Sequence, residues 1–401
     1  MKRFLLSPVL AAVLVVLNGT SVQANSHDDN HFERCMADLS QRAIERGYDQ
    51  SLVAETLGKA QPLPRVISLD KKQPEFSQSF ANYLYGRVNQ WRIDKGRQLY
   101  RQYQPLLDQL THRYGVPGQY IIAFWGLETN YGGYLGYTSL IDALATLACD
   151  ARRSAYFSEE LLQSVALMQR YNIPKSKMQG SWAGAMGNTQ FMPSNYMRYG
   201  IDGDGDGRVD LWESIPDALT SAANFLHKLG WHRGERWGRE VQLPDGFNYV
   251  LASGKADYSV DEWRQLGVRM ADGGDLPKSD LKGRLLLPAS ASGPAFLLYE
   301  NFDIIMKWNR SEFYALSVGH LSDRIVGGGD LVRPPSASAV VKTRIIKKLQ
   351  QVLTDQGYDT RGVDGVMGPS TRAAISAYQS DHQMIADGFP SLELIQRLNI
   401  E

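Results

Sequence analysis

Apolar residues recur at three- and four-residue steps through much of the chain, and this spacing constrains the fold more than any other feature of the sequence. Between residues 76 and 103 the apolar positions that follow it are Phe80, Leu84, Val88, Trp91 and Leu99. Residues at this spacing lie on one face of an α-helix, so we expect a helix over 76–103. The same argument predicts further helices over 32–47, 155–172, 214–229 and 301–320.

Shorter apolar runs between residues 240 and 300 interrupt the helical pattern. The segments 285–288 and 295–299 are too short for helices and favour strands. The sequence therefore predicts a mainly α domain with a small β element.

A segment rich in glycine, proline and serine precedes the last sixty or so residues. Gly327–Gly329 and Arg333–Ser338 have the composition of a linker. Beyond them, helices are expected over 345–353 and 370–380. A unit of this size is small for an independent domain, so we expect an appended binding module. The predicted boundaries are a large domain over 25–330, a linker over 331–339 and a small helical module over 340–401.

The first residues predict export. Lys2 and Arg3 precede the apolar run 9–17, and the segment 21–24 has small or aliphatic residues where a signal peptidase would cut. The apolar run is too short to span a bilayer stably. We therefore expect residues 1–24 to be a cleaved signal peptide. No cysteine directly follows the cleavage site, so no lipid or other membrane anchor is expected.

Cys35 and Cys149 are the two cysteines of the chain. In an oxidising compartment an even pair is a candidate disulfide. Two separate buried thiols are the alternative.

Composition argues against several function classes. Acidic and basic residues balance at 43 each, so the chain has no basic excess for binding nucleic acid. The seven histidines include no His-Glu-x-x-His pattern of a zinc peptidase. No Gly-x-Gly-x-x-Gly follows a predicted strand, and no organic cofactor is expected.

Glu128 is the one carboxylate in the strongly apolar segment Ile121–Gly133. We expect it at the end of a buried helix. Burial and the partial negative charge of a helix C-terminus both disfavour an ionised carboxyl. A group in this setting stays protonated near neutral pH, as a general acid must. The alternative is a glutamate at the water-facing edge of a core helix.

The segment Gly180–Pro193 is dense in glycine, aromatic residues and uncharged hydrogen-bonding groups. Glycine lets backbone approach a ligand closely, while Ser181 and Gln190 can donate and accept hydrogen bonds. Trp182 or Phe191 can pack on the apolar face of a sugar ring. This composition favours a sugar-binding loop, with a tightly packed glycine corner as the alternative.

Residues 202–213 match the twelve-residue calcium-binding loop of EF-hands. Acidic side chains fall at positions 1, 3, 5, 9 and 12, glycine falls at position 6, and position 7 contributes a backbone carbonyl. The expected ligands are Asp202, Asp204, Asp206, Arg208, Asp210 and Glu213. Since helical sequence flanks the segment on both sides, we predict an EF-hand-like loop with a structural Ca²⁺. A solvated acidic turn is the alternative.

Two further pairs of polar residues are candidates for ligand contact. Asn309 and Tyr314, on the predicted last helix, can line a saccharide groove, although such residues are more often the core and surface of an amphipathic helix. Arg152 and Arg153 can hold an acidic substituent, with a solvated basic pair as the alternative.

Together these motifs resemble those of the membrane-unanchored lytic murein transglycosylases of the B type. The similarity runs from about Phe32 to Ile325. It rests on the Glu128 segment, on Gly180-Ser-Trp-Ala-Gly-Ala-Met-Gly and Gln190-Phe-Met-Pro, and on the aspartate-rich loop. Residues 363–374 are similar to the peptidoglycan-binding module appended to wall enzymes.

The resemblance implies a lysozyme-like, goose-type-like catalytic fold in which Glu128 serves as both acid and base. The residues that match positions lining the glycan groove are Ser181, Gln190, Phe191, Met192, Asn309 and Tyr314. Arg152 and Arg153 match a basic pair near the groove. Two departures are Trp308, where tyrosine is expected, and Asn188-Thr189, where a smaller or differently polar pair is expected.

The implied reaction cleaves the bond between N-acetylmuramic acid and N-acetylglucosamine in peptidoglycan, in the periplasm, and forms 1,6-anhydromuramyl ends. Peptidoglycan strands are the expected partner, and other cell-wall enzymes are candidate partners. A hydrolytic muramidase and a non-catalytic wall-binding protein are the alternatives.

Overall fold

The structure, a computed structural model, describes residues 26–71, 78–252, 257–336 and 341–400. The expected signal peptide over 1–24 lies outside these residues. Among the helices that are described, none combines the length and the apolar character needed to cross a bilayer.

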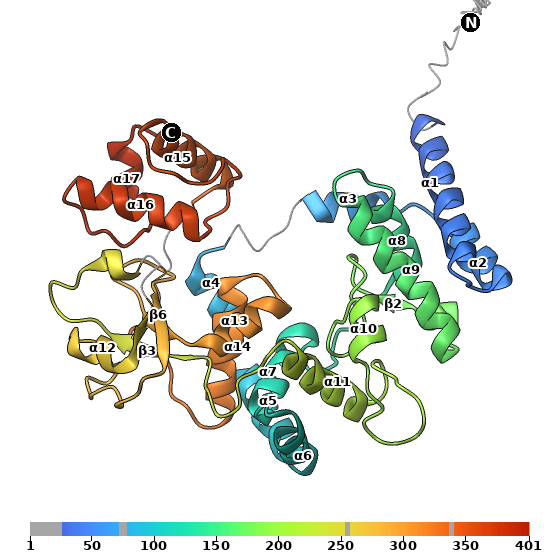
Figure 1. The fold of residues 1–401 in the computed structure, drawn as a ribbon, viewed down its shortest axis with the longest axis horizontal. Coiled ribbons are helices and arrows are strands. Elements are labelled where there is room, and N and C mark those ends of the chain that lie inside the picture. The colour runs from blue at the N-terminus through green and yellow to red at the C-terminus, as the bar shows by residue number, and fades with distance from the viewer. Residues whose placement is uncertain (1–25, 72–77, 253–256, 337–340, 401) are drawn as a thin grey trace, which may run out of the picture.

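Six helices form one half of the large domain, at the right of Figure 1. The helices are α1 (Ser26–Glu45), α2 (Gln50–Thr56), α3 (Pro64–Lys71), α8 (Leu140–Ala148), α9 (Ser154–Tyr171) and α10 (Pro193–Tyr199). They surround a core that includes Leu39, Leu144 and Leu161. Cys35 on α1 and Cys149 at the end of α8 are joined by a disulfide.

Seven helices form the other half, around a second core. They are α4 (Phe80–Arg87), α5 (Gln90–Gln102), α6 (Gln104–Tyr114), α7 (Gly118–Thr129), α11 (Ile215–Lys228), α13 (Glu300–Trp308) and α14 (Glu312–Ile325). Phe124, Leu226 and Phe302 are buried in this core. Short 3-10 helices lie at Leu57–Lys59, Lys175–Lys177 and Tyr249–Ala252.

Two segments predicted as single helices are each divided into two. Within the segment 76–103, the helix is interrupted after Arg87, and Asn89 caps α5, because its side chain accepts a hydrogen bond from the Arg92 amide. Within 301–320, Asn309 is extended (φ −139°, ψ 121°), and Ser311 caps α14 by accepting from the Tyr314 amide. The apolar spacing runs across both breaks, so periodicity alone does not reveal them.

The β element is a five-stranded antiparallel sheet in the order β4-β6-β7-β3-β5. Its strands are β3 (Gly238–Gln242), β4 (Tyr258–Ser259), β5 (Arg269–Met270), β6 (Lys282–Leu286) and β7 (Ala295–Leu298), with α12 (Val260–Gln265) beside them. Trp263 and Leu297 are fully buried in its core. The sequence predicted β6 and β7, the longer apolar runs. A separate pair of strands, β1 (Thr138–Ser139) and β2 (Gln179–Gly180), lies in the helical region.

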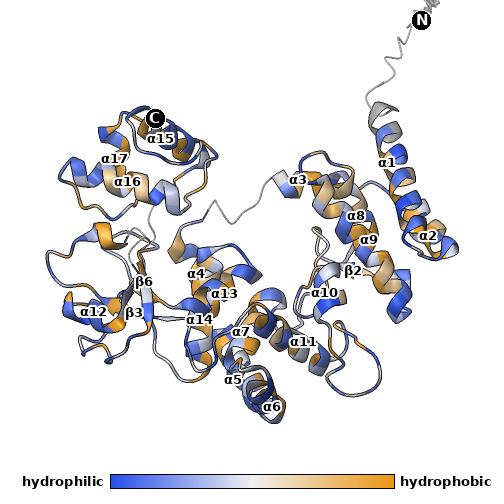
Figure 2. Cartoon of the chain, viewed as in Figure 1, coloured by the Kyte–Doolittle hydropathy of each residue, from blue (hydrophilic) through white to orange (hydrophobic). Residues whose placement is uncertain are grey.

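The C-terminal unit has three helices, α15 (Thr343–Asp355), α16 (Pro369–Asp381) and α17 (Leu392–Arg397). Leu349, Ile375 and Leu394 form its core. The helix α17 was not predicted, because six residues are too few to show a helical period. Figure 2 shows both apolar and hydrophilic residues on the helices of this unit, as amphipathic helices around a small core require.

Candidate active site

Glu128 lies in the last turn of the apolar helix α7, as the sequence predicted. Every residue from Tyr120 to Gly126 is buried, and the Glu128 side chain is half-buried where the helix reaches the surface. The helix ends because Asn130 adopts the left-handed conformation (φ 52°), which stops helical hydrogen bonding and turns the chain. The sequence thus places one carboxyl group at the boundary between a packed core and water.

Two side chains from the α13–α14 region hold the Glu128 carboxyl group. The Tyr314 hydroxyl donates a hydrogen bond to Oε1 at 2.5 Å, and the Trp308 indole Nε1 donates to the same oxygen at 2.9 Å. The extended backbone at Asn309 separates the helices, so that the last residue of α13 and the first turn of α14 both reach Glu128. The sequence predicted one continuous helix over 301–320, and this break was therefore not predicted.

Trp308 also joins the two halves of the large domain, because it packs against both helical cores. Its ring lies 4.4 Å from that of Phe124 and 5.1 Å from that of Phe225, measured between centroids. The site around Glu128 therefore lies where the two cores meet. The sequence showed Trp308 only as a departure from a family pattern, and its hydrogen bond to Glu128 was not predicted.

The Gly180–Pro193 loop lies next to the chain that leaves α7. Ser181 Oγ accepts hydrogen bonds from the amides of Ala183 and Ala185, which fixes the start of the loop. Gln190 has a positive φ of 49°, and its Nε2 donates to the carbonyl of Leu135 at 3.2 Å. Ser181 and Gln190 are half-buried.

Asn188 connects the same loop to α7 through two hydrogen bonds. Its Oδ1 accepts from Trp125 Nε1 at 3.0 Å, and its carbonyl accepts from Thr129 Oγ1 at 2.8 Å. Asn188 is buried, so the unexpected residue at this position has a structural contact to the helix that carries Glu128. Met192 and Asn309 are half-buried.

The expectation that Phe191 lines a groove is not met. Its side chain is 1% exposed and packs against the rings of Phe225 and Trp308, with centroids 5.3 Å and 5.4 Å away. Phe191 belongs to the core that contains Leu39, Leu144 and Leu161, and the hydrophobic effect that would favour stacking on a sugar buries it there instead. Phe191 therefore packs against Trp308 and helps to hold its ring in place.

Arg152 and Arg153 lie beside Asp70 of α3. Arg152 Nη2 is 3.0 Å from Asp70 Oδ2, and Arg153 Nη1 is 3.8 Å from Asp70 Oδ1. The Asp70 side chain is 5% exposed, so these two cations compensate a buried charge. Arg152 also pairs with Asp150 at 2.9 Å. The pair is thus already engaged with acidic groups of the protein, which the sequence did not reveal.

The aspartate-rich loop connects α10 to α11, but its carboxylates are not arranged as the EF-hand pattern predicted. Glu213 Oε2 pairs with Lys177 Nζ at 2.9 Å, and Asp210 Oδ2 pairs with it at 3.2 Å. The carboxylates that come within 4.8 Å of one another are those of Asp202, Asp204 and Asp217. Asp217 lies on α11, outside the twelve-residue pattern, and a search confined to that pattern misses it.

Asp202, Asp204 and Asp217 offer the oxygen ligands that a hard cation such as Ca²⁺ prefers. Asp217 is buried, and its oxygens accept hydrogen bonds from the amides of Gly203 and Asp210. The residues present therefore fit a divalent cation. Arg208 and Asp206 are exposed side chains of the same loop.

Comparison with known proteins agrees with this architecture. The chain matches the transglycosylase SLT domain over residues 31–323 and a peptidoglycan binding domain over residues 344–398. It is 30% identical to the membrane-bound lytic murein transglycosylase B of Escherichia coli (strain K12) over 296 residues, which are 70% of this chain and 79% of that protein.

Two solved structures are informative. SltB3 of Pseudomonas aeruginosa, in complex with NAG-anhNAM-pentapeptide, has a TM-score of 0.87 and 40% identity, over 92% of this chain and 99% of that one. The Escherichia coli lytic transglycosylase Slt35, in complex with calcium, has a TM-score of 0.61 and 29% identity, over 73% of this chain and 93% of that one. The chain therefore belongs to the transglycosylase SLT domain family, as a lytic transglycosylase of the B type with a C-terminal peptidoglycan-binding domain.

Proposed function

We propose that this protein cleaves the glycan strands of peptidoglycan and that Glu128 is both the acid and the base of the reaction. The observation that carries the proposal is the Glu128 carboxyl group, half-buried at the end of α7 and held by Tyr314 and Trp308. The relative of known structure that covers most of this chain was solved with NAG-anhNAM-pentapeptide, a ligand with an anhydromuramyl end.

In the first step, Glu128 protonates the glycosidic oxygen between N-acetylmuramic acid and N-acetylglucosamine. Tyr314 and Trp308 donate hydrogen bonds to Oε1 and so orient the carboxyl group that transfers this proton. The bond from C1 of the muramyl ring to this oxygen breaks. The positive charge that develops on the ring is met by the substrate's own acetamido group.

In the second step, the carboxylate of Glu128 removes the proton from the C6 hydroxyl of the same muramyl ring. The C6 oxygen attacks C1 and closes a 1,6-anhydro bond, which returns the proton to Glu128 and consumes no water. Because this hydroxyl is attached to the reacting ring, its effective concentration far exceeds that of a loosely placed water. Tyr314 and Trp308 keep the carboxyl group in one orientation through both proton transfers.

The residues proposed to line the glycan groove are Ser181, Gln190, Met192, Asn309 and Tyr314. Ser181, Gln190, Met192 and Asn309 are half-buried, Tyr314 contacts Glu128, and hydrogen bonds fix the Gly180–Pro193 loop. Phe191 acts through Trp308. Arg152 and Arg153 are 43% and 49% exposed while paired with Asp70, and they stay proposed contacts for an acidic substituent of the strand.

We further propose export to the periplasm through a signal peptide over 1–24 and a structural Ca²⁺ at Asp202, Asp204 and Asp217. The support is the N-terminal sequence pattern, the oxygen-rich cluster, and the calcium complex of a structural relative. When bound, the ion would neutralise the like charges of the three carboxylates. The C-terminal domain is proposed to hold the enzyme on peptidoglycan.

Glu128→Gln tests the proposed function directly. The substitution keeps the shape of the side chain and removes its acid, so we expect the fold to persist and glycan cleavage to fall at least about 10²–10⁴-fold. Glu235→Gln is the matched control, because Glu235 is another half-buried glutamate that accepts a hydrogen bond from the Asn301 amide. Near-normal cleavage by a folded Glu128→Gln protein would overturn the proposal.

A further inference from the structure

Two tyrosines in the loop that follows Glu128 are largely exposed to solvent. Tyr137 is 76% exposed and Tyr134 is 60% exposed, which makes them the two most exposed aromatic side chains of the described chain. Their rings form an edge-to-face pair with centroids 5.6 Å apart. Neither ring belongs to a hydrophobic core of the protein. A single exposed aromatic residue is ordinary, but two adjacent ones form an apolar patch that needs a reason.

The backbone under the two rings is fixed. The amide of Tyr134 donates to the carbonyl of Thr129 at 3.0 Å, and Gln190 Nε2 donates to the carbonyl of Leu135. Gly136 has a φ of 87°, and a side chain there would place Cβ 2.1 Å from the carbonyl oxygen of Gly180. Only glycine fits between these two segments, so the loop is pressed against the start of the sugar-binding loop.

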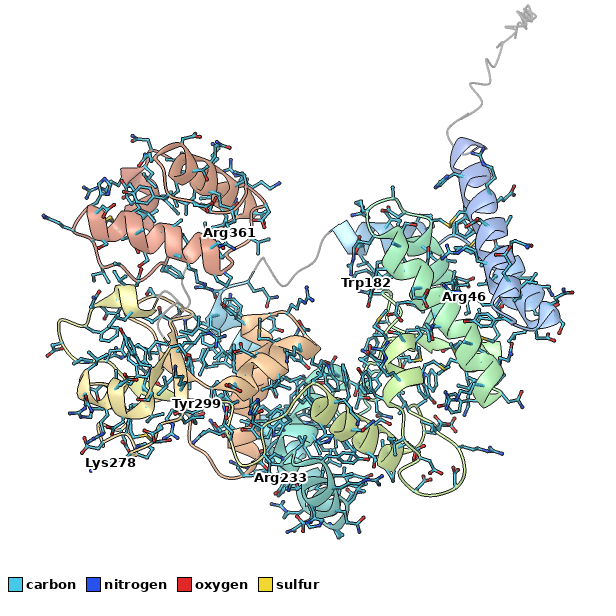
Figure 3. The ribbon with its side chains drawn as sticks, viewed as in Figure 1. Arg46, Trp182, Arg233, Lys278, Tyr299 and Arg361 are labelled. Atoms are coloured by element: carbon cyan, nitrogen blue, oxygen red, sulfur yellow. A yellow bond between two sulfur atoms is a disulfide. The ribbon has the colours of Figure 1, made fainter. Side chains whose placement is uncertain are left out.

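This packing locates the tyrosine pair relative to the site. Tyr137 directly precedes β1, which pairs with β2 through Thr138 and Gly180. Ser181 and Trp182 follow β2, and Figure 3 shows Trp182 at the edge of its half of the domain that faces the other half. The loop that carries the exposed rings therefore lies beside the segments of Ser181 and Gln190, which are proposed groove residues.

We propose that Tyr134 and Tyr137 form an aromatic platform that stacks on an N-acetylhexosamine ring of the bound strand, away from the bond that is cut. The inference deepens the proposed cleavage of glycan strands and rests on it. Sugar rings have apolar faces that pack on aromatic rings, and tyrosine provides a large contact area with few rotatable bonds. The platform adds a binding contact to a long strand and plays no part in proton transfer.

The test compares Tyr137→Ala, Tyr134→Ala and the double variant with wild type on long, peptide-free glycan strands. We expect KM to rise about tenfold for the double variant, with kcat within about twofold of wild type, because the platform contributes binding alone. Tyr137→Phe and Tyr134→Phe keep the ring and should keep the wild-type KM. Tyr85→Ala on α4 is the matched control, since Tyr85 is also an exposed tyrosine (52%) but lies outside the loop.

A second measurement removes turnover. In a Glu128→Gln background, the dissociation constant for the same strands should rise by a similar factor when both tyrosines become alanine. An unchanged KM and dissociation constant in the folded double variant would overturn the platform, and so would a loss confined to kcat. If wild type itself fails to cleave these strands, the proposed function fails, while the binding measurement still judges the platform.

Discussion

The Tyr314 hydroxyl on α14 donates a hydrogen bond to Glu128 Oε1 on α7, and the two oxygens are 2.5 Å apart. The contact depends on the break at Asn309–Ser311, because Ser311 starts α14 and so turns Tyr314 toward the end of α7. Trp308 reaches the same oxygen from the end of α13. One short irregular segment thus supplies two hydrogen-bond donors to Glu128 Oε1.

Tyr314→Phe should lower kcat about 10–100-fold and leave KM nearly unchanged. A hydrogen bond to a charged group contributes about 1.5–3 kcal/mol, and this one orients the carboxyl group during proton transfer. The melting temperature checks that the fold persists. A kcat equal to that of wild type would show that Tyr314 does not orient Glu128.

Trp308→Phe should cost about tenfold in kcat, less than Tyr314→Phe. The phenyl ring keeps much of the packing against Phe124 and Phe225 but lacks the indole N–H that reaches Glu128. Steady-state kinetics and a melting curve on the same preparation separate the two contributions. A large fall in melting temperature with unchanged kcat per folded molecule would assign Trp308 to packing alone.

Calcium should raise the melting temperature without being required for cleavage. At about 100-fold excess over its Kd a bound ion contributes about 2.7 kcal/mol. Asp204→Ala should abolish this stabilisation, because Asp204 belongs to the carboxylate cluster.

Glu213→Gln is the informative comparison for calcium. Glu213 pairs with Lys177 and is 72% exposed, so the variant should keep the calcium-dependent rise in melting temperature. Loss of the rise in Glu213→Gln would show that Glu213 is a calcium ligand, as the twelve-residue EF-hand pattern predicts. No rise in the melting temperature of wild type would show that calcium does not stabilise this protein.

Deleting residues 331–401 should lower binding to insoluble peptidoglycan about 10–100-fold while cleavage of short soluble glycans stays within about threefold. A tethered module raises the effective concentration of the enzyme at a polymer, which matters little for a small substrate. The module does contact the catalytic domain, through Arg372 Nη2 and Glu312 Oε2 at 2.9 Å and through the Ala291 amide and Asp387.

Full-length Arg372→Ala is the control for the truncation, because it removes the ion pair and keeps the module. It should bind insoluble peptidoglycan as wild type does. If the truncated protein loses activity on short glycans as strongly as on the polymer, the module is part of the catalytic fold.

The sequence predicted the elements whose signal is local. The apolar run before Glu128 gave both the helix α7 and the carboxyl group at its end, and the runs 285–288 and 295–299 gave two strands of the sheet. It missed the breaks at Asn89 and Asn309, because a capping side chain ends a helix without changing the apolar spacing around it.

Contacts between distant segments had no such signal. Asp70 lies some eighty residues before Arg152, and nothing in its neighbours marks it as the acid that engages the basic pair. The same holds for Asp217, one turn beyond the motif that was recognised, and for Trp308 as a partner of Glu128. Phe191 was predicted to line the glycan groove, because its burial in a core is a property of the assembled fold.

The mass of the new glycan end tests the central claim most directly. Peptidoglycan is digested with wild-type protein, and the muropeptides are measured by mass spectrometry before and after borohydride reduction. We predict muramyl ends that are lighter than muramidase products by one water and that reduction leaves unchanged, since a 1,6-anhydro end has no free reducing carbon. Ends that borohydride reduces would show that water is the acceptor, and the protein would then be a hydrolytic muramidase.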